Sequence, residues 1–213
     1  MAFKRFILSA AALVAAAMMT IGGAAAEPRQ IVAFGDSLTA GFGLDAGKSF
    51  PEKLQAALDT KGHDVVIANA GVSGDTTSGG LARLDWSVPD GTDIVILELG
   101  ANDMLRGVTP DITRRNLDDM ITRLKARGIT VLLAGMRAAP NLGPDYQQAF
   151  DAIYPELAQE HGLVLYPFFL DGVAADRQFL LDDGMHPNAA GVDRMVERFL
   201  PVIEKVLAET GAT

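Results

Sequence analysis

Residues 29–41, RQIVAFGDSLTAG, join a short apolar run to a turn of small and polar residues. The apolar residues 31–34 have the length and composition of a buried β-strand. Ser37 in the turn is then either a nucleophile between a strand and a helix or a hydroxyl that caps the helix. Small and polar residues follow strands in many proteins, so the rest of the chain must decide between these two interpretations.

The same succession of strand and helix recurs along the chain. Four more apolar segments of strand length follow, at 65–68, 94–99, 129–134 and 163–166. Helical patterns occur at 51–61, around Leu81, and at 110–127, 146–160 and 189–208. Such alternation is typical of a parallel sheet, and strands rich in Val, Ile and Leu predict that helices cover both of its faces. The sequence predicts one three-layer α/β/α domain.

Helix boundaries agree with this prediction. Thr109 followed by Pro110 is typical of a helix start. Gly62, Gly128 and Gly162 follow three of the helical patterns, as glycines do where a helix ends.

The first 26 residues have the pattern of a secretory signal peptide. Lys4 and Arg5 precede a long apolar run, which ends in the small residues 24–26 before Glu27. A membrane anchor is the alternative, because the run approaches the roughly 18 residues that span a bilayer. Its alanine content and the cleavage-type ending favour removal, which predicts a periplasmic or secreted protein with a mature domain at 27–213.

Charge and cysteine content exclude several classes of function. Removing the signal peptide takes away two positive charges and no negative ones, so the formal charge falls from −9 to −11. This acidity disfavours nucleic acid or an anionic membrane as the main partner. The chain has no cysteine, which excludes thiolate nucleophiles and thiolate metal sites. Nothing in the sequence indicates a protein partner, or a membrane span after cleavage.

Four loops concentrate glycine, asparagine, aspartate and serine. Three follow the first three predicted strands and one follows the fifth, and they read GDSLTAGFGL, NAGVSGDTTSGG, GANDMLRG and LDDGMHPNAAG. Ligands of open parallel sheets bind beyond the carboxyl ends of the strands, where such loops meet. We therefore look for the functional residues in these loops.

A serine nucleophile needs a base, and the chain has three histidines. His63 and His161 stand beside glycines at helix ends, where histidines commonly lie on the surface. His186 follows Asp183 by three residues, a spacing that lets a carboxylate orient the imidazole. The alternative is that Asp183 and Asn188 only form a turn and a helix cap.

Acyl transfer also needs hydrogen-bond donors for the oxyanion. The candidates are the backbone N–H groups of Ser37 and Gly74 and the side-chain amide of Asn102. Taken singly, Gly74 is more typical of a turn glycine and Asn102 of a turn or cap residue than of oxyanion donors. Asp36 and Asp103 flank these positions, and we expect them to support the loops through side-chain to backbone hydrogen bonds.

The four motifs GDSLTAG, GDT, GxND and DxxHP occur in this order across the chain. In this they resemble the SGNH hydrolase family, also called the GDSL esterase/lipase family. The segments NAGVSGDTTSGGLARL, ELGANDMLRG, AFDAIYPELA, PFFL and DDGMHPN are most similar to its bacterial periplasmic acyl thioesterase, lysophospholipase and arylesterase subgroup.

The resemblance implies a flavodoxin-like five-stranded parallel sheet in the order 2-1-3-4-5. It implies Ser37 as nucleophile, His186 as base and Asp183 as the carboxylate that orients it. The oxyanion hole would consist of the Ser37 and Gly74 amides and the Asn102 side chain. The implied substrate is a small-molecule or lipid ester or thioester, and no metal or organic cofactor is implied.

Two other classes of function stay open at this point. One is a secreted flavodoxin-like binding module, although the chain lacks a GxxxxGKS phosphate loop. The other is a metal-dependent phosphoesterase, which the absence of HxH and HxxxH pairs disfavours. An α/β-hydrolase is disfavoured because the serine lies in GDSLT rather than GxSxG.

Overall fold

The computed structural model of the protein describes residues 27–210. The predicted signal peptide lies outside these residues. The strands are β1 (Arg29–Gly35), β2 (Val65–Gly71), β3 (Ile94–Glu98), β4 (Thr130–Ala134) and β5 (Val164–Tyr166). The α-helices are α1 (Ser37–Ala40), α2 (Phe50–Thr60), α3 (Thr77–Ser87), α4 (Ala101–Leu105), α5 (Pro110–Ala126), α6 (Pro144–His161) and α7 (Ala189–Thr210). Two short 3-10 helices are η1 (Pro140–Leu142) and η2 (Arg177–Phe179).

All five strands are parallel and lie in the order β2-β1-β3-β4-β5, which confirms the predicted topology. β1 lies between β2 and β3, with Ile31 opposite Ile67 on one side and Ile94 on the other. The connections leave β1 in opposite directions along the sheet, so its carboxyl end is the switch point where such folds bind ligands. Ser37 follows this end of β1 directly.

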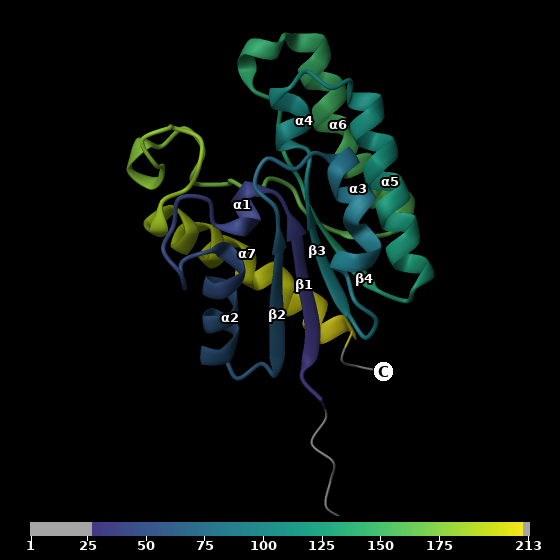
Figure 1. The fold of residues 1–213 in the computed structure, drawn as a ribbon, viewed down its shortest axis with the longest axis vertical. Coiled ribbons are helices and arrows are strands. Elements are labelled where there is room, and N and C mark those ends of the chain that lie inside the picture. Colours follow the sequence, from purple (N-terminus) through teal and green to yellow (C-terminus); the bar gives the residue numbers. More distant parts are fainter. Residues whose placement is uncertain (1–26, 211–213) are drawn as a thin grey trace, which may run out of the picture.

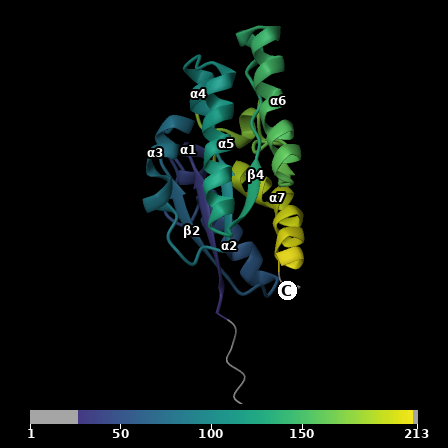
Figure 2. The same ribbon diagram turned by 90° about the vertical axis from the view of Figure 1, so that its right-hand side faces the viewer.

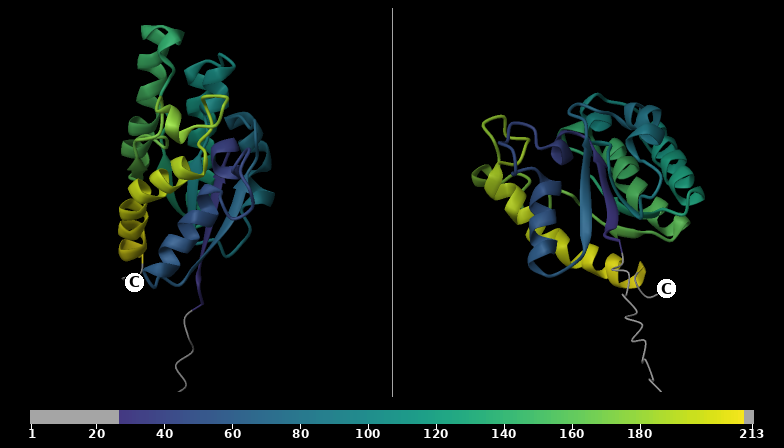
Figure 3. Two further views of the ribbon diagram at one scale, coloured as in Figure 1. Left: turned by 90° about the vertical axis from the view of Figure 1, so that its left-hand side faces the viewer. Right: turned by 60° about the horizontal axis from the view of Figure 1, so that its bottom comes forward.

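Helices cover the sheet in two layers, as predicted (Figure 1). α2 and α7 pack together on one face, while α3, α5 and α6 cover the other. Figure 2 turns α5 toward the viewer, and Figure 3 shows α2 and α7 side by side on their face. Phe50 of α2 and Phe199 of α7 meet edge to face, with ring centroids 5.2 Å apart.

The central strands form the core, but the edge strand differs from the prediction. Every residue of β3 is buried, because helices cover both of its faces. β2 lies at the edge of the sheet, and its Val66 is 46% exposed. The expectation that helices cover both faces is therefore wrong for β2.

Four predicted helices occur within about two residues of their expected ends, and the short pattern around Leu81 forms α3. Gly62, Gly128 and Gly162 have positive φ of 79°, 75° and 65°, as a left-handed helix stop requires. Two helices were not predicted, α1 and α4, which have four and five residues and so are too short to show a helical period. Among the described helices, none combines the length and hydropathy needed to span a bilayer.

Candidate active site

Ser37 is the first residue of α1, at the carboxyl end of β1. Asp36 caps this short helix, because its Oδ1 accepts a hydrogen bond of 3.0 Å from the Leu38 N–H. Gly41 ends the helix with φ of 82°. The sequence placed Ser37 in a turn between a strand and a helix, and the structure condenses that turn into one helical turn. The segment before α7, yellow-green in Figure 1, lies at the same end of the sheet as α1.

The structure brings Ser37, His186 and Asp183 into one chain of hydrogen bonds. His186 Nε2 lies 2.9 Å from Ser37 Oγ, and His186 Nδ1 lies 2.7 Å from Asp183 Oδ2. Ser37 is 8% exposed, so its hydroxyl is held in a fixed environment. A base within hydrogen-bond reach of a hydroxyl, oriented from behind by a carboxylate, can take the hydroxyl proton.

Asp183 is held as a carboxylate by its own turn. Its Oδ1 accepts the N–H groups of Met185 at 2.9 Å and His186 at 3.0 Å. These bonds, with that to the imidazole, lower the pKa of Asp183 from 3.8 to about 2. Its charge is therefore present throughout the neutral range and stabilises an imidazolium at His186.

Asn188 anchors the segment that follows His186, and Phe42, from the loop after α1, packs against the imidazole. Asn188 Oδ1 accepts the N–H of Gly191 at 3.0 Å, and Asn188 Nδ2 donates to the Leu180 carbonyl at 3.2 Å. The Phe42 ring lies against the imidazole, with centroids 4.5 Å apart. Asn188 does cap the final helix, as the turn interpretation expects. The same segment also places the His186 imidazole beside Ser37.

The candidate oxyanion donors lie on the neighbouring segments. Asn102 is in the first turn of α4, and its Nδ2 donates to Asp36 Oδ2 at 3.0 Å. A primary amide has two hydrogens, so the second remains available for a ligand. Gly74 has φ of 80°, and its carbonyl accepts a hydrogen bond of 2.7 Å from Arg106, which ends α4. α4 thus connects Asn102 to the Gly74 loop.

Asp36 and Asp103 make the expected contacts with backbone. Besides the Leu38 bond of Asp36, Asp103 Oδ2 accepts the N–H of Thr77 at 2.8 Å at the start of α3. Asp103 Oδ1 also accepts the Thr77 hydroxyl at 2.5 Å. These bonds join α4 to α3 below the candidate site.

Arg83 was not predicted as a site residue, although it connects two of the motif loops. Its side chain is buried in α3 and donates to Asp75 Oδ2 at 2.7 Å. It also donates to the carbonyls of Ala70 at 2.8 Å and Gly35 at 2.9 Å. Arg83 therefore holds the turn of the nucleophile against the loop that carries Gly74. An arginine within a helix of small residues shows no signal of this role in the sequence.

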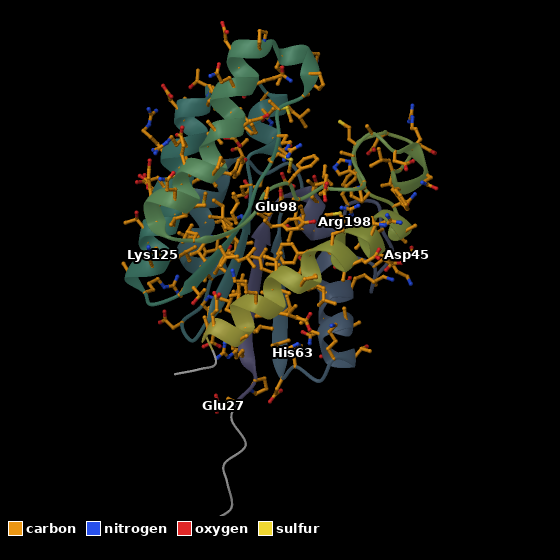
Figure 4. All side chains as sticks on the ribbon, turned by 180° about the vertical axis from the view of Figure 1, so that it is seen from behind. Glu27, Asp45, His63, Glu98, Lys125 and Arg198 are labelled. Carbon is orange, nitrogen blue, oxygen red and sulfur yellow. The ribbon has the colours of Figure 1, made fainter. Side chains whose placement is uncertain are left out.

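Glu98 was also missed. It is fully buried at the end of β3, and its Oε2 accepts the Thr39 hydroxyl at 2.8 Å and the Asp36 N–H at 3.2 Å. Figure 4 labels Glu98 in the interior of the fold. Burial raises the pKa of Glu98 well above 4.5 and that of Asp36 from 3.8 to about 6. A single charged residue within the apolar run 94–99 was the available signal.

The other two histidines lie beside carboxylates of other helices, away from Ser37. His63 Nε2 lies 3.1 Å from Glu204, and His161 Nε2 lies 2.5 Å from Asp118. Asp118, Glu160 and His161 place ligand-type atoms within 4.8 Å of one another. Glu160, however, is paired with Arg114 at 2.5 Å. This group lies between α5 and the carboxyl end of α6, next to the start of β5, at the opposite end of the sheet from Ser37.

Comparison with known proteins places this geometry in a family. Residues 33–194 match the GDSL-like lipase/acylhydrolase family. The arylesterase of Vibrio mimicus is 41% identical over 169 residues, which cover 79% of this chain and 84% of that protein. The thioesterase 1/protease 1/lysophospholipase L1 of Escherichia coli K12 is 37% identical over 191 residues, which cover 87% of this chain and 89% of that protein.

A solved structure agrees with these sequence relatives. The crystal structure of AlinE4, an SGNH-hydrolase family esterase, superposes with a TM-score of 0.71 at 48% identity. The match covers 85% of this chain and 97% of that one. Because the family match spans most of the domain and carries the motifs that surround Ser37, the chain belongs to the GDSL-like lipase/acylhydrolase family.

Proposed function

We propose that the protein hydrolyses carboxylic esters or thioesters through an acyl intermediate on Ser37. The observation that carries this proposal is the chain of hydrogen bonds from Ser37 Oγ through His186 to Asp183, at 2.9 and 2.7 Å. It lies at the switch point of the sheet, where the fold binds ligands. Membership of an acylhydrolase family supports the same chemistry.

In the first half of the reaction Ser37 Oγ attacks the carbonyl carbon while His186 Nε2 takes the hydroxyl proton. The carbonyl oxygen becomes an oxyanion, for which the N–H groups of Ser37 and Gly74 and the free hydrogen of the Asn102 amide are the donors. The intermediate then expels the alcohol or thiol, which takes the proton back from His186. Asp183 stabilises the imidazolium between these two proton transfers.

Water completes the reaction. His186 takes a proton from water, and the resulting hydroxide attacks the acyl carbon of the Ser37 ester. The Ser37 oxygen leaves, regains its proton from His186 and releases the carboxylic acid. The same donors hold the second oxyanion, so one site serves both halves of the reaction.

Apolar side chains near the candidate site support an acyl or aryl group as the part of the substrate that is bound. Phe42 and Met185 flank His186 and are 49% and 51% exposed. Val72 and Leu105, beside the Gly74 and Asn102 loops, are 44% and 58% exposed. The loop from β4 to α6 lies next to α4, where the Ala139 N–H meets Met104 Sδ at 3.5 Å. We infer that this loop contacts the acyl chain.

Acyl-chain length is testable with p-nitrophenyl esters. Each methylene that the site buries is worth about 0.8 kcal/mol, so kcat/KM rises roughly fourfold per methylene until the binding surface is filled. The same assay with a lysophospholipid and with acyl-CoA distinguishes oxygen esters from thioesters.

The predicted signal peptide supports a periplasmic or secreted enzyme, whose substrates would be lipids or environmental esters rather than cytosolic acyl-CoA. Cell fractionation tests this inference. Recovery of the mature protein in the cytoplasm would contradict it.

The decisive experiment replaces Ser37 by alanine. We expect Ser37→Ala to keep the circular dichroism spectrum and to lose nearly all hydrolysis of p-nitrophenyl acetate. An organophosphate should label Ser37 in the parent protein and leave the variant unlabelled. Near-normal hydrolysis by the variant would refute the proposal and would favour a binding module or another nucleophile.

A further inference from the structure

A second pair of carboxyl groups lies directly beneath the nucleophile, and the reaction described above does not use it. Glu98 and Asp36 are both fully buried, one at the end of β3 and the other just before Ser37. Burying two carboxyl groups side by side is costly unless they share a proton or meet a cation. The question is what this pair does for the reaction.

Glu98 is in close contact with the turn of the nucleophile. Its Oε2 accepts the Asp36 N–H and the Thr39 hydroxyl, one on each side of Ser37. A Cβ at Gly35 would lie 2.5 Å from this oxygen and 2.7 Å from the Glu98 carbonyl oxygen. Glycine is therefore required in the GDS motif because Glu98 occupies the space beneath it.

The second oxygen, Glu98 Oε1, is buried and has no donor among the described residues. The polar group next to Glu98 that remains is the carboxyl of Asp36, whose own backbone N–H donates to Glu98 Oε2. Two carboxylates buried beside each other repel, and neither can donate a hydrogen bond to the other. One of the two must carry a proton.

The surroundings of the pair decide which residue holds this proton. Burial and the charge of Asp36 raise the pKa of Glu98 well above its ordinary value. Asp36 reaches only about 6, because burial is offset by the Leu38 N–H, the Asn102 amide and His186. Asp75 adds a weaker repulsion to Asp36. At neutral pH the proton therefore lies on Glu98 and the charge on Asp36.

Two other titratable groups, on α6 and α4, lie near the pair. The buried Tyr154 hydroxyl donates its proton to the Leu99 backbone carbonyl at 2.9 Å, so it does not donate to Glu98. Asp103 accepts hydrogen bonds from the N–H and the hydroxyl of Thr77. The buried Arg83 donates to the Gly35 carbonyl and to Asp75, and no ion pair joins it to Glu98 among the described residues.

We propose that Glu98 is a positioning residue for the oxyanion hole: its protonated carboxyl donates from Oε1 to Asp36, and Asp36 then orients the amide of Asn102. The geometry supports this because Asp36 Oδ2 accepts from Asn102 Nδ2. A charged Asp36 can only accept, so it binds the NH₂ side of the amide. A neutral Asp36 could donate to the amide oxygen instead, and that would turn an acceptor toward the substrate.

This inference rests on the proposed role of Asn102 as an oxyanion donor. It predicts that a neutral donor at position 98 is sufficient. Glu98→Gln has the same shape as a protonated glutamate: its oxygen can accept from Asp36 and Thr39, and its NH₂ can donate to Asp36. Glu98→Met has a similar length and offers no polar group.

The experiment measures kcat and KM for p-nitrophenyl acetate with both variants, after circular dichroism has shown that they are folded. We expect Glu98→Met to lose on the order of 10²-fold in kcat with little change in KM, as for a misplaced catalytic group. The kcat of Glu98→Gln should stay within roughly fivefold of that of the parent enzyme. This loss is much smaller than the loss expected for a missing oxyanion donor. Glu156→Gln, on the exposed face of α6, is the matched control and should leave both constants unchanged.

A double-mutant cycle separates positioning from general stabilisation. If Glu98 acts through Asn102, Glu98→Met should cost much less kcat in an Asn102→Ala background than alone. Purely structural damage would cost the same factor in both backgrounds, and that result would overturn the proposal.

Infrared difference spectroscopy detects the protonated Glu98 carboxyl directly and does not require an active enzyme. The carbonyl band of a buried carboxylic acid should be present at neutral pH in the parent and in Ser37→Ala, and absent in Glu98→Gln. Absence of this band from the parent would overturn the proposal, as would a Glu98→Gln variant that is folded and as inactive as Glu98→Met. Because the band does not depend on turnover, these outcomes are distinct from failure of the proposed hydrolysis.

Discussion

The buried proton on Glu98 predicts how stability depends on pH. Folding holds the carboxyl in its protonated form, whereas unfolding returns its pKa to about 4.5, so unfolding releases a proton at neutral pH. The pKa is higher in the folded than in the unfolded state. Stability is therefore greatest below pH 4.5 with respect to this group and falls as the pH rises toward the folded pKa.

The expected size follows from the linkage relation. One proton released on unfolding lowers the free energy of unfolding by about 1.4 kcal/mol per pH unit. Glu98→Gln has no such proton, so at pH values below the folded pKa of Glu98 its stability should rise relative to the parent by up to about 1.4 kcal/mol per pH unit. Asp183 titrates in both proteins and cancels in the difference, whereas Asp36 titrates near pH 6 beside Glu98, so the comparison is made above that pH.

Urea unfolding followed by circular dichroism at several pH values measures this difference. For a denaturant slope of about 2 kcal/mol/M, the gap between the two midpoints should change by up to about 0.7 M per pH unit. Glu156→Gln is again the control and should run parallel to the parent. If the curves of Glu98→Gln and the parent are parallel as well, Glu98 is ionised in the folded protein, and the reasoning about the carboxyl pair is refuted.

Three substitutions and a treatment with EDTA test the site and its supports. Asn102→Ala should lower kcat by about 10²- to 10³-fold with little change in KM, because one oxyanion donor is lost, and unchanged kcat would remove Asn102 from the reaction. Asp183→Asn should lower kcat by at least about 10²-fold at neutral pH, since the imidazole loses the carboxylate that orients it. With a pKa of about 2 against an ordinary 3.8, the Asp183 carboxylate favours folding above pH 3.8, and this contribution is lost as the pH falls toward 2. Arg83→Met should reduce the free energy of unfolding, measured in urea, by roughly 3 kcal/mol or more, because it leaves Asp75 and two carbonyls without their donor. A loss below about 1 kcal/mol would show that other donors replace these bonds. Hydrolysis should survive EDTA, because the proposed mechanism uses only side chains and water, and a loss reversed by added metal would contradict it.

Most element boundaries were predictable because they depend on local apolar runs, whereas the strand order was predicted from the resemblance to a known family. The strand at 94–98, for example, is Val-, Ile- and Leu-rich with a Gly after it, and it lies at the centre of the sheet. The exposure of Val66 was not predictable, because an edge strand and a central strand can carry the same apolar residues. Similarly, α1 and α4 follow the ends of β1 and β3 closely and are too short to show a helical period, so the apolar pattern could not predict them.

The residues of the candidate site likewise fall into two groups, those that the sequence predicted and those that it did not. Ser37, Asp183 and His186 were recognisable from their motifs, and the structure places them in hydrogen-bond contact. Their roles in the reaction remain predictions until the variants are made. Glu98 and Arg83 were not recognisable, because their partners come from strands and loops far away in the sequence. The role of a buried charged side chain depends on the groups that it contacts, and only the fold brings these groups together.

The two side-chain hydrogen bonds of His186 join residues at very different separations along the sequence. Asp183 and His186 are three residues apart, whereas Ser37 and His186 are 149 apart. Closing a loop of this length costs about 4 kcal/mol of chain entropy, beyond a constant, so this contact forms only after much of the apolar core has assembled. On refolding, helical circular dichroism should therefore recover before hydrolysis does. The carboxylate and imidazole are paired by their own turn, and the serine reaches them only when the first and last β/α units of the chain have docked against each other.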